Sequence, residues 1–240
     1  MAHQNPRVIH TAYGDKTVEV VYDDGRHFIR TTKEKFDIIT SDPIDPWVKG
    51  CAALNTVEYY EMCKQHLKPG GVMSLWIPLY ESNQDSIKSV IATFFHVYTN
   101  GIFWSNDING EGYDAVLFGR VEPTVFDIPK LQARLDREDH RLVKASLAEV
   151  NFNSATDLLA TYSGRASSLQ AWMQGAQLNT DRNLRLQYLA GFWLNSSMSG
   201  EILNGIHKSF VFPKDMFSGS EDRLLDLKAA LIKGRRAKEL

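Results

Sequence analysis

The 240-residue sequence is poor in cysteine, with only Cys51 and Cys63. Neither belongs to a Cys-x-x-Cys pair or to a Cys/His array, which disfavours both a disulfide framework and a structural zinc site. His27, His66 and His96 also lack partners at ligand spacing, so we expect no metal. A reducing compartment fits this cysteine usage, and we predict a cytoplasmic location.

The sequence also lacks a long apolar run and a dominant charge. No stretch approaches the roughly 18 apolar residues that a membrane-spanning helix needs, and the start lacks the basic-then-apolar pattern of a leader. The 27 basic and 29 acidic side chains give a net charge of -2, so there is no general attraction to nucleic acid or anionic membranes. The 43% of hydrophobic residues is enough for a globular core.

Strand-like and helix-like patterns alternate over residues 17–120, which is typical of a mostly parallel α/β sheet with helices on both faces. The predicted strands are 17–22, 36–41, 72–77, 101–104 and 113–118. The predicted helices are a short one within 26–35, one capped by Asn55 and one capped by Ser82 with Asp85. The last two strands should pair antiparallel at the sheet edge, and 17–22 should pair directly with 36–41.

Helical patterns dominate after residue 120. They cover about 129–150, 154–162, 184–194 and 221–238. We therefore predict an α/β part over residues 1–120 and a mainly helical part over 121–240. The basic cluster that ends the last pattern is typical of a solvated helix C-terminus, so no nucleic-acid partner is expected.

Ligands of open α/β sheets bind beyond the carboxyl ends of the strands, where this sequence places carboxylates. Asp24 and Gly25 follow the first predicted strand. The carboxylate could accept a hydrogen bond from the exocyclic amine of a nucleoside, and the glycine would let the base approach the backbone. Taken alone, however, the pair is explained by a turn.

Asp42 and Asp45 follow the second predicted strand, three residues apart on a loop stiffened by proline. Two such carboxylates can converge on one cation. A primary amine has a pKa of about 10 and must lose a proton before it attacks as a nucleophile. One carboxylate can orient the ammonium and accept that proton while the second holds the rest of the cation. Asp-Pro pairs also end strands and start turns, so both interpretations stay open.

Four segments together resemble the spermidine/spermine synthase family of polyamine aminopropyltransferases. They are Asp24-Gly25-Arg26-His27-Phe28, the run from Phe36 to Pro46, Leu54 with Glu58-Tyr59-Tyr60, and Leu67-Lys68-Pro69-Gly70-Gly71-Val72. The resemblance covers about residues 5–119 and is strongest to the bacterial synthase-like branch. Some members of that branch carry the domain fused to membrane segments, which implies that a membrane-linked parent protein is an option here.

The resemblance implies a methyltransferase-type Rossmann fold and aminopropyl transfer from decarboxylated S-adenosylmethionine to putrescine or a related amine. That donor is a co-substrate, so no permanently bound cofactor and no metal are implied. Asp24 and Gly25 would contact the adenine. Asp42 would be the catalytic base and would also contact the nucleotide, and Asp45 would help to bind the amine.

Two tryptophans occupy the regions where many members carry other substrate-binding residues. Trp76 lies near the end of a strand where a glutamine is common, and Trp104 lies near the last strands, where a tyrosine is expected. We assign both tryptophans to the substrate site. No Gly-Gly-Gly-Asp-Gly nucleotide loop occurs in the sequence, so the expected Rossmann-like sheet is partial and the activity of this chain alone is in question.

Two alternatives remain. The fold could instead serve an S-adenosylmethionine-dependent methyltransferase in which the Asp42 loop touches the acceptor. It could also be a non-catalytic interaction or assembly module, because exposed sheet edges favour self-association into a homo-oligomer. The paired Asp42 and Asp45 favour a cationic small-molecule substrate, and so aminopropyl transfer over the methyltransferase alternative.

Overall fold

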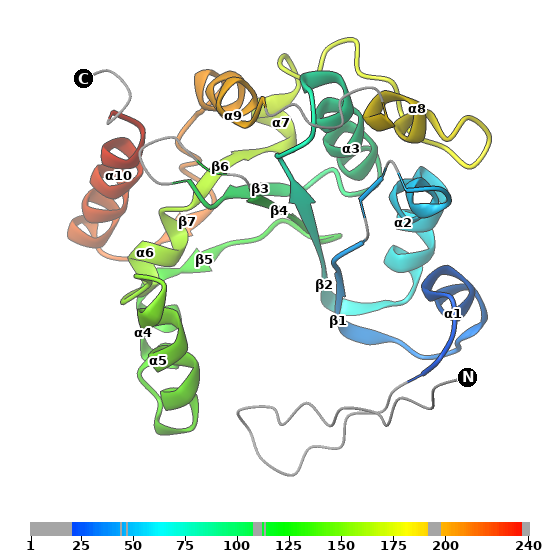
Figure 1. Ribbon diagram of the computed structural model, residues 1–240. Coiled ribbons are helices and arrows are strands. Elements are labelled where there is room, and N and C mark those ends of the chain that lie inside the picture. The colour runs from blue at the N-terminus through cyan, green and yellow to red at the C-terminus, as the bar shows by residue number, and fades with distance from the viewer. Residues whose placement is uncertain are drawn as a thin grey trace.

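A computed structural model describes residues 21–43, 45–46, 48–107, 112, 114–191 and 198–236. Within them, five strands form one sheet in the order β1-β2-β4-β3-β6 (Figure 1). These strands are β1 (Phe36–Ser41), β2 (Leu67–Pro78), β3 (Ile102–Ser105), β4 (Asp114–Gly119) and β6 (Tyr162–Arg165). β1 and β2 pair in parallel, whereas the β2–β4, β3–β4 and β3–β6 pairs are antiparallel.

The α/β class is confirmed, but the expectation of a mostly parallel sheet is wrong, because the described sheet is mixed. Its parallel pair is β1 and β2, joined through a helical crossover as in Rossmann-like folds. β3 and β4 are antiparallel as predicted. They do not form the edge, because β4 inserts beside β2 and β6 adds to β3.

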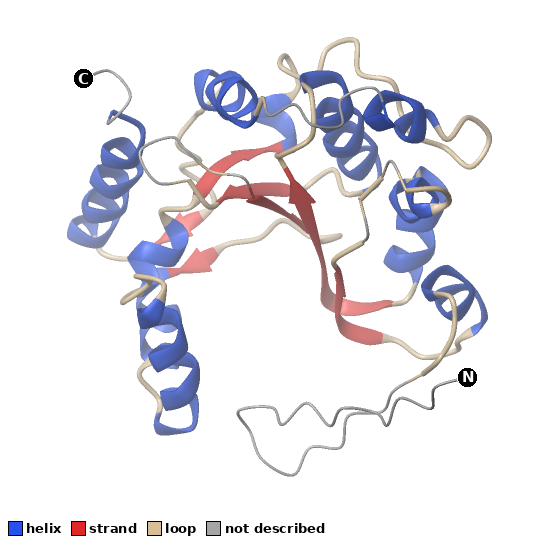
Figure 2. Ribbon diagram, viewed as in Figure 1, coloured by secondary structure: helices blue, strands red, loops and turns tan. Residues whose placement is uncertain are grey.

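Helices lie on both sides of this sheet, and Figure 2 shows them around the strands. The helices and 3₁₀ helices are α1 (Gly25–Thr31), η1 (Cys51–Asn55), α2 (Val57–Gln65), α3 (Gln84–Val97), α4 (Ile128–Leu135), η2 (Glu138–His140), α5 (Arg141–Glu149), α6 (Ala155–Leu159), α7 (Ala166–Leu169), α8 (Arg185–Gly191), α9 (Ser199–Lys208) and α10 (Glu221–Arg236). Within the described residues, no helix combines the length and the apolar character needed to cross a membrane.

Side chains alternate between the two faces of the central strands. On β2, Met73, Leu75 and Ile77 are buried, and on β4 so are Ala115 and Leu117. This face packs against the helices, with α2 in contact with β2 and α3 in contact with β4. The opposite face of both strands is only half-buried. Position along the strand therefore decides which side chains remain accessible to a ligand.

The C-terminal half joins both the sheet and the core. β6 pairs with β3, and Leu169, Leu186 and Ile206 belong to the same buried cluster as the residues of α3. A second cluster packs α6 and α10 around the short parallel pair β5 (Phe126–Asp127) and β7 (Phe217–Ser218). The division of the chain at residue 120 stays a prediction.

Two predicted helix caps are off by one residue. Thr56, not Asn55, caps α2, because its hydroxyl accepts the Tyr59 backbone N–H. The Asn55 side chain instead accepts a bond of 2.8 Å from the Tyr60 hydroxyl. Asn83, and not Ser82, caps α3.

Other boundaries also differ from expectation. The segment Lys68–Gly71, predicted to end a helix, lies inside β2, where the pairing with β1 shifts register and Gly70 adopts a φ of 75°. The predicted helix over 129–150 divides into α4, η2 and α5. Residues 17–20 of the first predicted strand lie outside the described residues, so its pairing with 36–41 is untested.

Candidate amine-binding site

The register of the central strands brings two carboxylates to one face of the sheet. Asp42 lies one residue beyond β1, level with Trp76 on the neighbouring strand. Across β2, Asp114 is the first residue of β4 and pairs with Pro78. Since side chains two residues apart on a strand share a face, Asp114 lies on the same face as Trp76. This is the half-buried face of the sheet.

Asp45 joins these groups from the loop that follows β1. Burial and the charge of Asp42 raise the pKa of Asp45. Burial also raises the pKa of Asp114, a hydrogen bond from Trp76 opposes the rise, and Asp42 adds to it. Burial and the surrounding carboxylates, Asp45 first, raise the pKa of the Tyr80 hydroxyl. We call Asp42, Asp45 and Asp114 the acidic cluster.

Two oxygens of the acidic cluster lack hydrogen bonds. Oδ1 of Asp45 and Oδ1 of Asp114 are both buried and have no partner within the described residues. A buried acceptor without a partner carries a penalty of about 1–3 kcal/mol, and more when it is charged. A cationic ligand with several N–H donors would remove that penalty at both positions and would offset the repulsion between the carboxylates.

Aromatic side chains border the acidic cluster. The rings of Trp76 and Tyr80 lie 6.2 Å apart with an interplanar angle of 53°. Both side chains are half-buried. Such rings offer an apolar surface to methylene groups and a π face to an ammonium group. Carboxylates beside aromatic rings therefore suit a ligand that combines an aliphatic chain with positive charge.

The predicted nucleotide contacts lie at the start of α1. Asp24 caps this helix, and its Oδ1 accepts the His27 backbone N–H at 2.8 Å. Gly25 begins the helix with open space where a Cβ would stand. This cap accounts for Asp24 structurally, so its contact with adenine remains a prediction.

Both predicted loops approach the N-terminal end of α2. From α1, Arg26 donates hydrogen bonds to the carbonyl of Ala53 at 2.7 Å and to the hydroxyl of Thr56 at 3.1 Å. From the end of β1, Ser41 lies close enough to the Tyr59 hydroxyl on α2 to lower its pKa, against the larger rise caused by burial. The loops that carry the nucleotide-site and amine-site predictions are thus tied to one helix end, as a shared site requires.

Trp104 packs in a different environment. Its ring makes edge contacts with Phe126 at 5.5 Å and with Tyr162 at 5.9 Å. It shares a face with Trp76, because both pair with Val116 from opposite sides of β4. The structure therefore brings Asp42, Asp45 and Trp76 together and places Trp104 in the second apolar cluster, so its assignment to the substrate stays a prediction.

Sequence reasoning missed Asp114 and Tyr80. Asp114 lies within the predicted strand at 113–118 and is the first residue of β4, and Tyr80 follows the predicted strand at 72–77. Their proximity depends on the antiparallel register of β2 and β4, which pairs Asp114 with Pro78. A register prediction from the alternation of buried residues could have found this contact.

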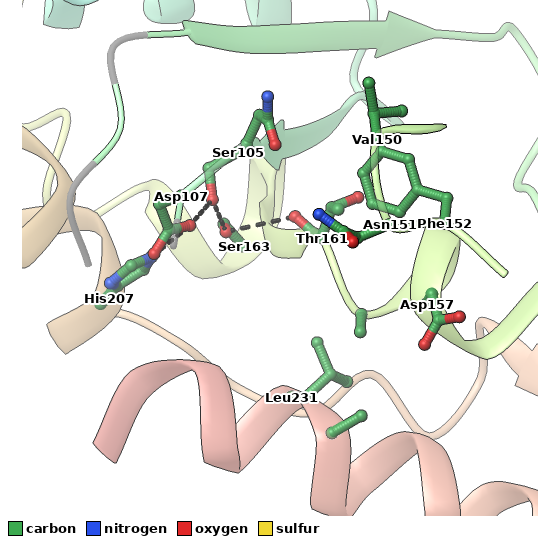
Figure 3. A pocket seen from close by; sticks show the side chains of 13 residues that line it. Ser105, Asp107, Val150, Asn151, Phe152, Asp157, Thr161, Ser163, His207 and Leu231 are labelled. Atoms are coloured by element: carbon green, nitrogen blue, oxygen red, sulfur yellow. Dashed lines mark hydrogen bonds and ion pairs between the residues drawn. The ribbon is translucent and has the colours of Figure 1, made fainter. Parts of the chain in front are cut away.

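A hollow lies at the junction of the two halves, away from the acidic cluster (Figure 3). It has a volume of about 230 Å³ and is bounded on one side by Ser105, Asp107 and Ser163 and on another by Leu231. Ser105 donates a hydrogen bond of 2.5 Å to Asp107 and lies 2.5 Å from the Ser163 hydroxyl. His207 on α9 lies 3.7 Å from the same carboxylate. These contacts fasten the end of β3 to β6 and α9.

Comparison with known proteins finds matches to part of the chain. A family model described as spermine/spermidine synthase domain matches residues 3–101. The polyamine aminopropyltransferase of Buchnera aphidicola is 44% identical over 68 residues, which are 28% of this chain and 23% of that protein. That of Nitrosomonas europaea is 40% identical over 79 residues, 32% of this chain and 24% of that protein.

Two further matches differ in extent. The polyamine aminopropyltransferase of Klebsiella pneumoniae is 46% identical over 61 residues, which are 25% of this chain and 21% of that protein. A crystal structure of a probable spermidine synthase from Corynebacterium glutamicum aligns with a TM-score of 0.43 and 20% identity, covering 66% of this chain and 52% of the other. The chain spans less than a quarter of the length of the curated relatives it matches.

Fold and site together define an α/β protein with carboxylates clustered beyond the carboxyl end of a parallel strand. Residues 3–101 match the family model for the spermine/spermidine synthase domain, in agreement with the resemblance drawn from the motifs. Within the described residues, no group of three or more His, Cys, Asp or Glu side chains is arranged to hold a metal ion.

Proposed function

We propose that the chain takes part in aminopropyl transfer from decarboxylated S-adenosylmethionine to a polyamine acceptor such as putrescine. The observation that carries this proposal is the unpartnered, buried Oδ1 of Asp45 beside Asp42, in a chain whose matched relatives are named polyamine aminopropyltransferases. An ammonium group would supply the missing donor.

Asp42 is the base in this proposal. It is exposed at the end of β1 and can accept a proton from the acceptor ammonium. The freed nitrogen attacks the aminopropyl carbon next to the sulfonium. A carbon–nitrogen bond forms, the carbon–sulfur bond breaks, and its electron pair returns to sulfur, leaving neutral methylthioadenosine. Asp45 holds the cation so that the nitrogen faces the carbon.

The donor would bind between the two loops that meet at α2. Support for this placement comes from the contacts of Arg26 with Ala53 and Thr56, which fix the Asp24 loop beside that helix. Asp24 and Gly25 would then contact the adenine. The donor is consumed in each turnover, so no permanently bound cofactor is needed.

The test is product formation from decarboxylated S-adenosylmethionine and putrescine, followed by mass spectrometry of methylthioadenosine and spermidine. We expect both products in equal amounts, and at least a hundredfold less of each with Asp42→Asn, within the range for loss of a general base. Asp37→Asn, which removes an exposed carboxylate at the other end of β1, is the matched control and should leave the rate unchanged. Absence of products, or an unaltered rate in Asp42→Asn, would contradict the proposal.

The non-catalytic assembly module is the second candidate. β1 borders the described sheet, and its Ile38 side chain is 67% exposed. Such an edge favours pairing with another strand, in a homo-oligomer or in a membrane-linked parent protein. Light scattering after size exclusion tests this candidate: a concentration-dependent mass with no turnover would support it over catalysis.

A further inference from the structure

We propose that Asp114 is a substrate-binding residue that holds an ammonium group of a di- or triamine acceptor. The inference rests on the proposed function and extends its site by a residue outside the recognised motifs. Asp114 also lies beyond residues 3–101, the part of the chain that the family model matches.

Strand register supports this role. Asp114 pairs with Pro78, which lies two residues beyond Trp76 on β2. The Asp114 side chain lies on the half-buried face of the sheet. Asp42 lies level with Trp76 on the other side of the same strand. The two carboxylates therefore flank β2 from opposite sides. That spacing suits two charged groups on one extended chain better than a single ammonium.

Among the described residues, the Asp114 carboxylate has an aromatic neighbour but lacks a hydrogen-bond donor for one of its oxygens. Trp76 lies close enough to this carboxylate to lower its pKa, while Oδ1 is buried and has no partner within the described residues. The Tyr80 ring lies 6.2 Å from the ring of Trp76, so a methylene chain can lie against both rings. The carboxylate therefore lies beside Trp76 and keeps a buried oxygen for which the described residues supply no donor.

The negative charges of the acidic cluster favour a ligand with more than one positive charge. Asp42, Asp45 and Asp114 bring up to three negative charges together, and burial together with Asp42 already disfavours ionisation of the other two. A monoammonium ligand leaves most of this repulsion in place, whereas a diamine supplies two positive charges. Asp114 should therefore contribute more to diamine binding than to monoamine binding.

The experiment is calorimetric titration of the full chain with 1,4-diaminobutane and with butylamine, in the absence of the aminopropyl donor. Butylamine matches the carbon chain and removes one amine. We expect Asp114→Asn to weaken diamine binding about tenfold or more, as for loss of one buried charge-pair partner, and butylamine binding less than threefold. Asp37→Asn, the exposed control, should change neither affinity.

Each outcome decides the inference. If Asp114→Asn binds the diamine as tightly as the unsubstituted chain, or loses affinity for both amines equally, the role of Asp114 is overturned while the proposed function stands. If the unsubstituted chain binds no diamine, the amine site itself fails and the inference fails with it. Circular dichroism and the melting temperature of Asp114→Asn exclude misfolding as the cause of a loss, because removing a carboxylate whose ionisation is disfavoured should not lower stability.

Discussion

At the residue scale, Asp45 is in an environment that disfavours its ionised form, because its carboxylate is partly buried beside the negative charge of Asp42. Burial and Asp42 raise its folded-state pKa above the unfolded value. For an acid shifted in this direction, the stabilising contribution is present below the unfolded pKa and is lost as pH rises through the folded pKa. At neutral pH the ionised carboxylate therefore destabilises the fold.

We expect Asp45→Asn to be more stable than the unsubstituted chain at pH 7, with the difference disappearing near pH 3, where the carboxyl is protonated in both states. Thermal unfolding at the two pH values measures this. Asp37→Asn should behave in the opposite way, because a hydrogen bond from Lys68 lowers the pKa of Asp37. A lower melting temperature for Asp45→Asn at pH 7 would contradict the electrostatic account.

The two cysteines differ in environment and should differ in reactivity. Burial raises the pKa of the Cys63 thiol to about 11, and this side chain is fully buried. Cys51 is half-buried, and burial with the charge of Asp45 raises its pKa as well. Since the thiolate is the reactive form, both should react slowly at pH 7.5.

We expect a water-soluble alkylating reagent to modify Cys51 first and Cys63 only after unfolding. Peptide mapping by mass spectrometry after timed exposure, with a sample in denaturant as the control, measures the order. Equal rates for the two thiols in the folded chain would show that Cys63 is not buried as described.

The sequence was sufficient to find part of the candidate site. Asp42 and Asp45 were predicted because both lie on one short loop directly after a recognisable strand. Asp114 was not, because its place in the acidic cluster depends on pairing with Pro78, a residue 36 positions away along the chain. Local patterns define strands, but nonlocal register decides which strand ends meet.

At the scale of elements, Asn179 connects segments that are far apart in the chain. Its side-chain N–H groups donate to the carbonyls of Ala52 and Asn55 at 2.8 and 2.9 Å, and its Oδ1 accepts the Leu186 backbone N–H at 3.1 Å. The side chain is fully buried. Asn179 thus joins η1 to α8.

We expect Asn179→Ala to destabilise the fold by about 3 kcal/mol, because it leaves three buried backbone groups without their partners. Urea denaturation followed by circular dichroism gives the free energy of unfolding. Asn183→Ala, a nearby exposed asparagine of the same turn, is the control and should cost about 1 kcal/mol or less. Similar losses for both variants would mean that the buried bonds add little.

The N-cap of α3 was predicted to be Ser82, and the structure places Asn83 there. The two assignments can be compared by mutation. Asn83 Oδ1 accepts both the backbone N–H and the hydroxyl of Ser86 at 2.7 Å. We expect Asn83→Ala to cost about 1 kcal/mol of stability, the usual effect of losing an N-cap. Denaturation of Asn83→Ala beside Ser82→Ala measures the difference, and a larger loss for Ser82→Ala would restore the original cap prediction.

A strand with a run of strand-forming residues was predicted correctly. A strand whose formation depends on tertiary contacts was missed. Phe36–Ser41 is rich in strand-forming residues and was found with its boundaries. Tyr162–Arg165 was missed because its sequence, Tyr-Ser-Gly-Arg, is short and polar for a strand. It forms β6 because β3 offers a pairing edge, and because Gly164 leaves room for Leu169, whose Cγ would lie 2.9 Å from an added Cβ.

At the scale of the whole molecule, the open question is whether residues 1–120 can fold without the rest. Three observations oppose independence: β6 pairs with β3, α9 contacts α3, and five buried side chains of the first apolar cluster come from the second half. These five are Leu169, Leu186, Ile202, Leu203 and Ile206. At roughly 1.5–3 kcal/mol for each buried side chain, their loss would remove about 10 kcal/mol. That is comparable with the entire stability of an ordinary domain, about 5–15 kcal/mol.

We therefore expect a chain truncated after residue 120 to lose cooperative folding, since the β3 edge and the apolar side of α3 would both be exposed. Thermal unfolding by circular dichroism and elution on size exclusion measure this, with the full chain as the reference. Adding a separately produced fragment of residues 121–240 should restore a cooperative transition if the shared sheet and core are the cause. A truncated chain that melts cooperatively by itself would instead establish residues 1–120 as an independent domain, and the acidic cluster could then be studied within it alone.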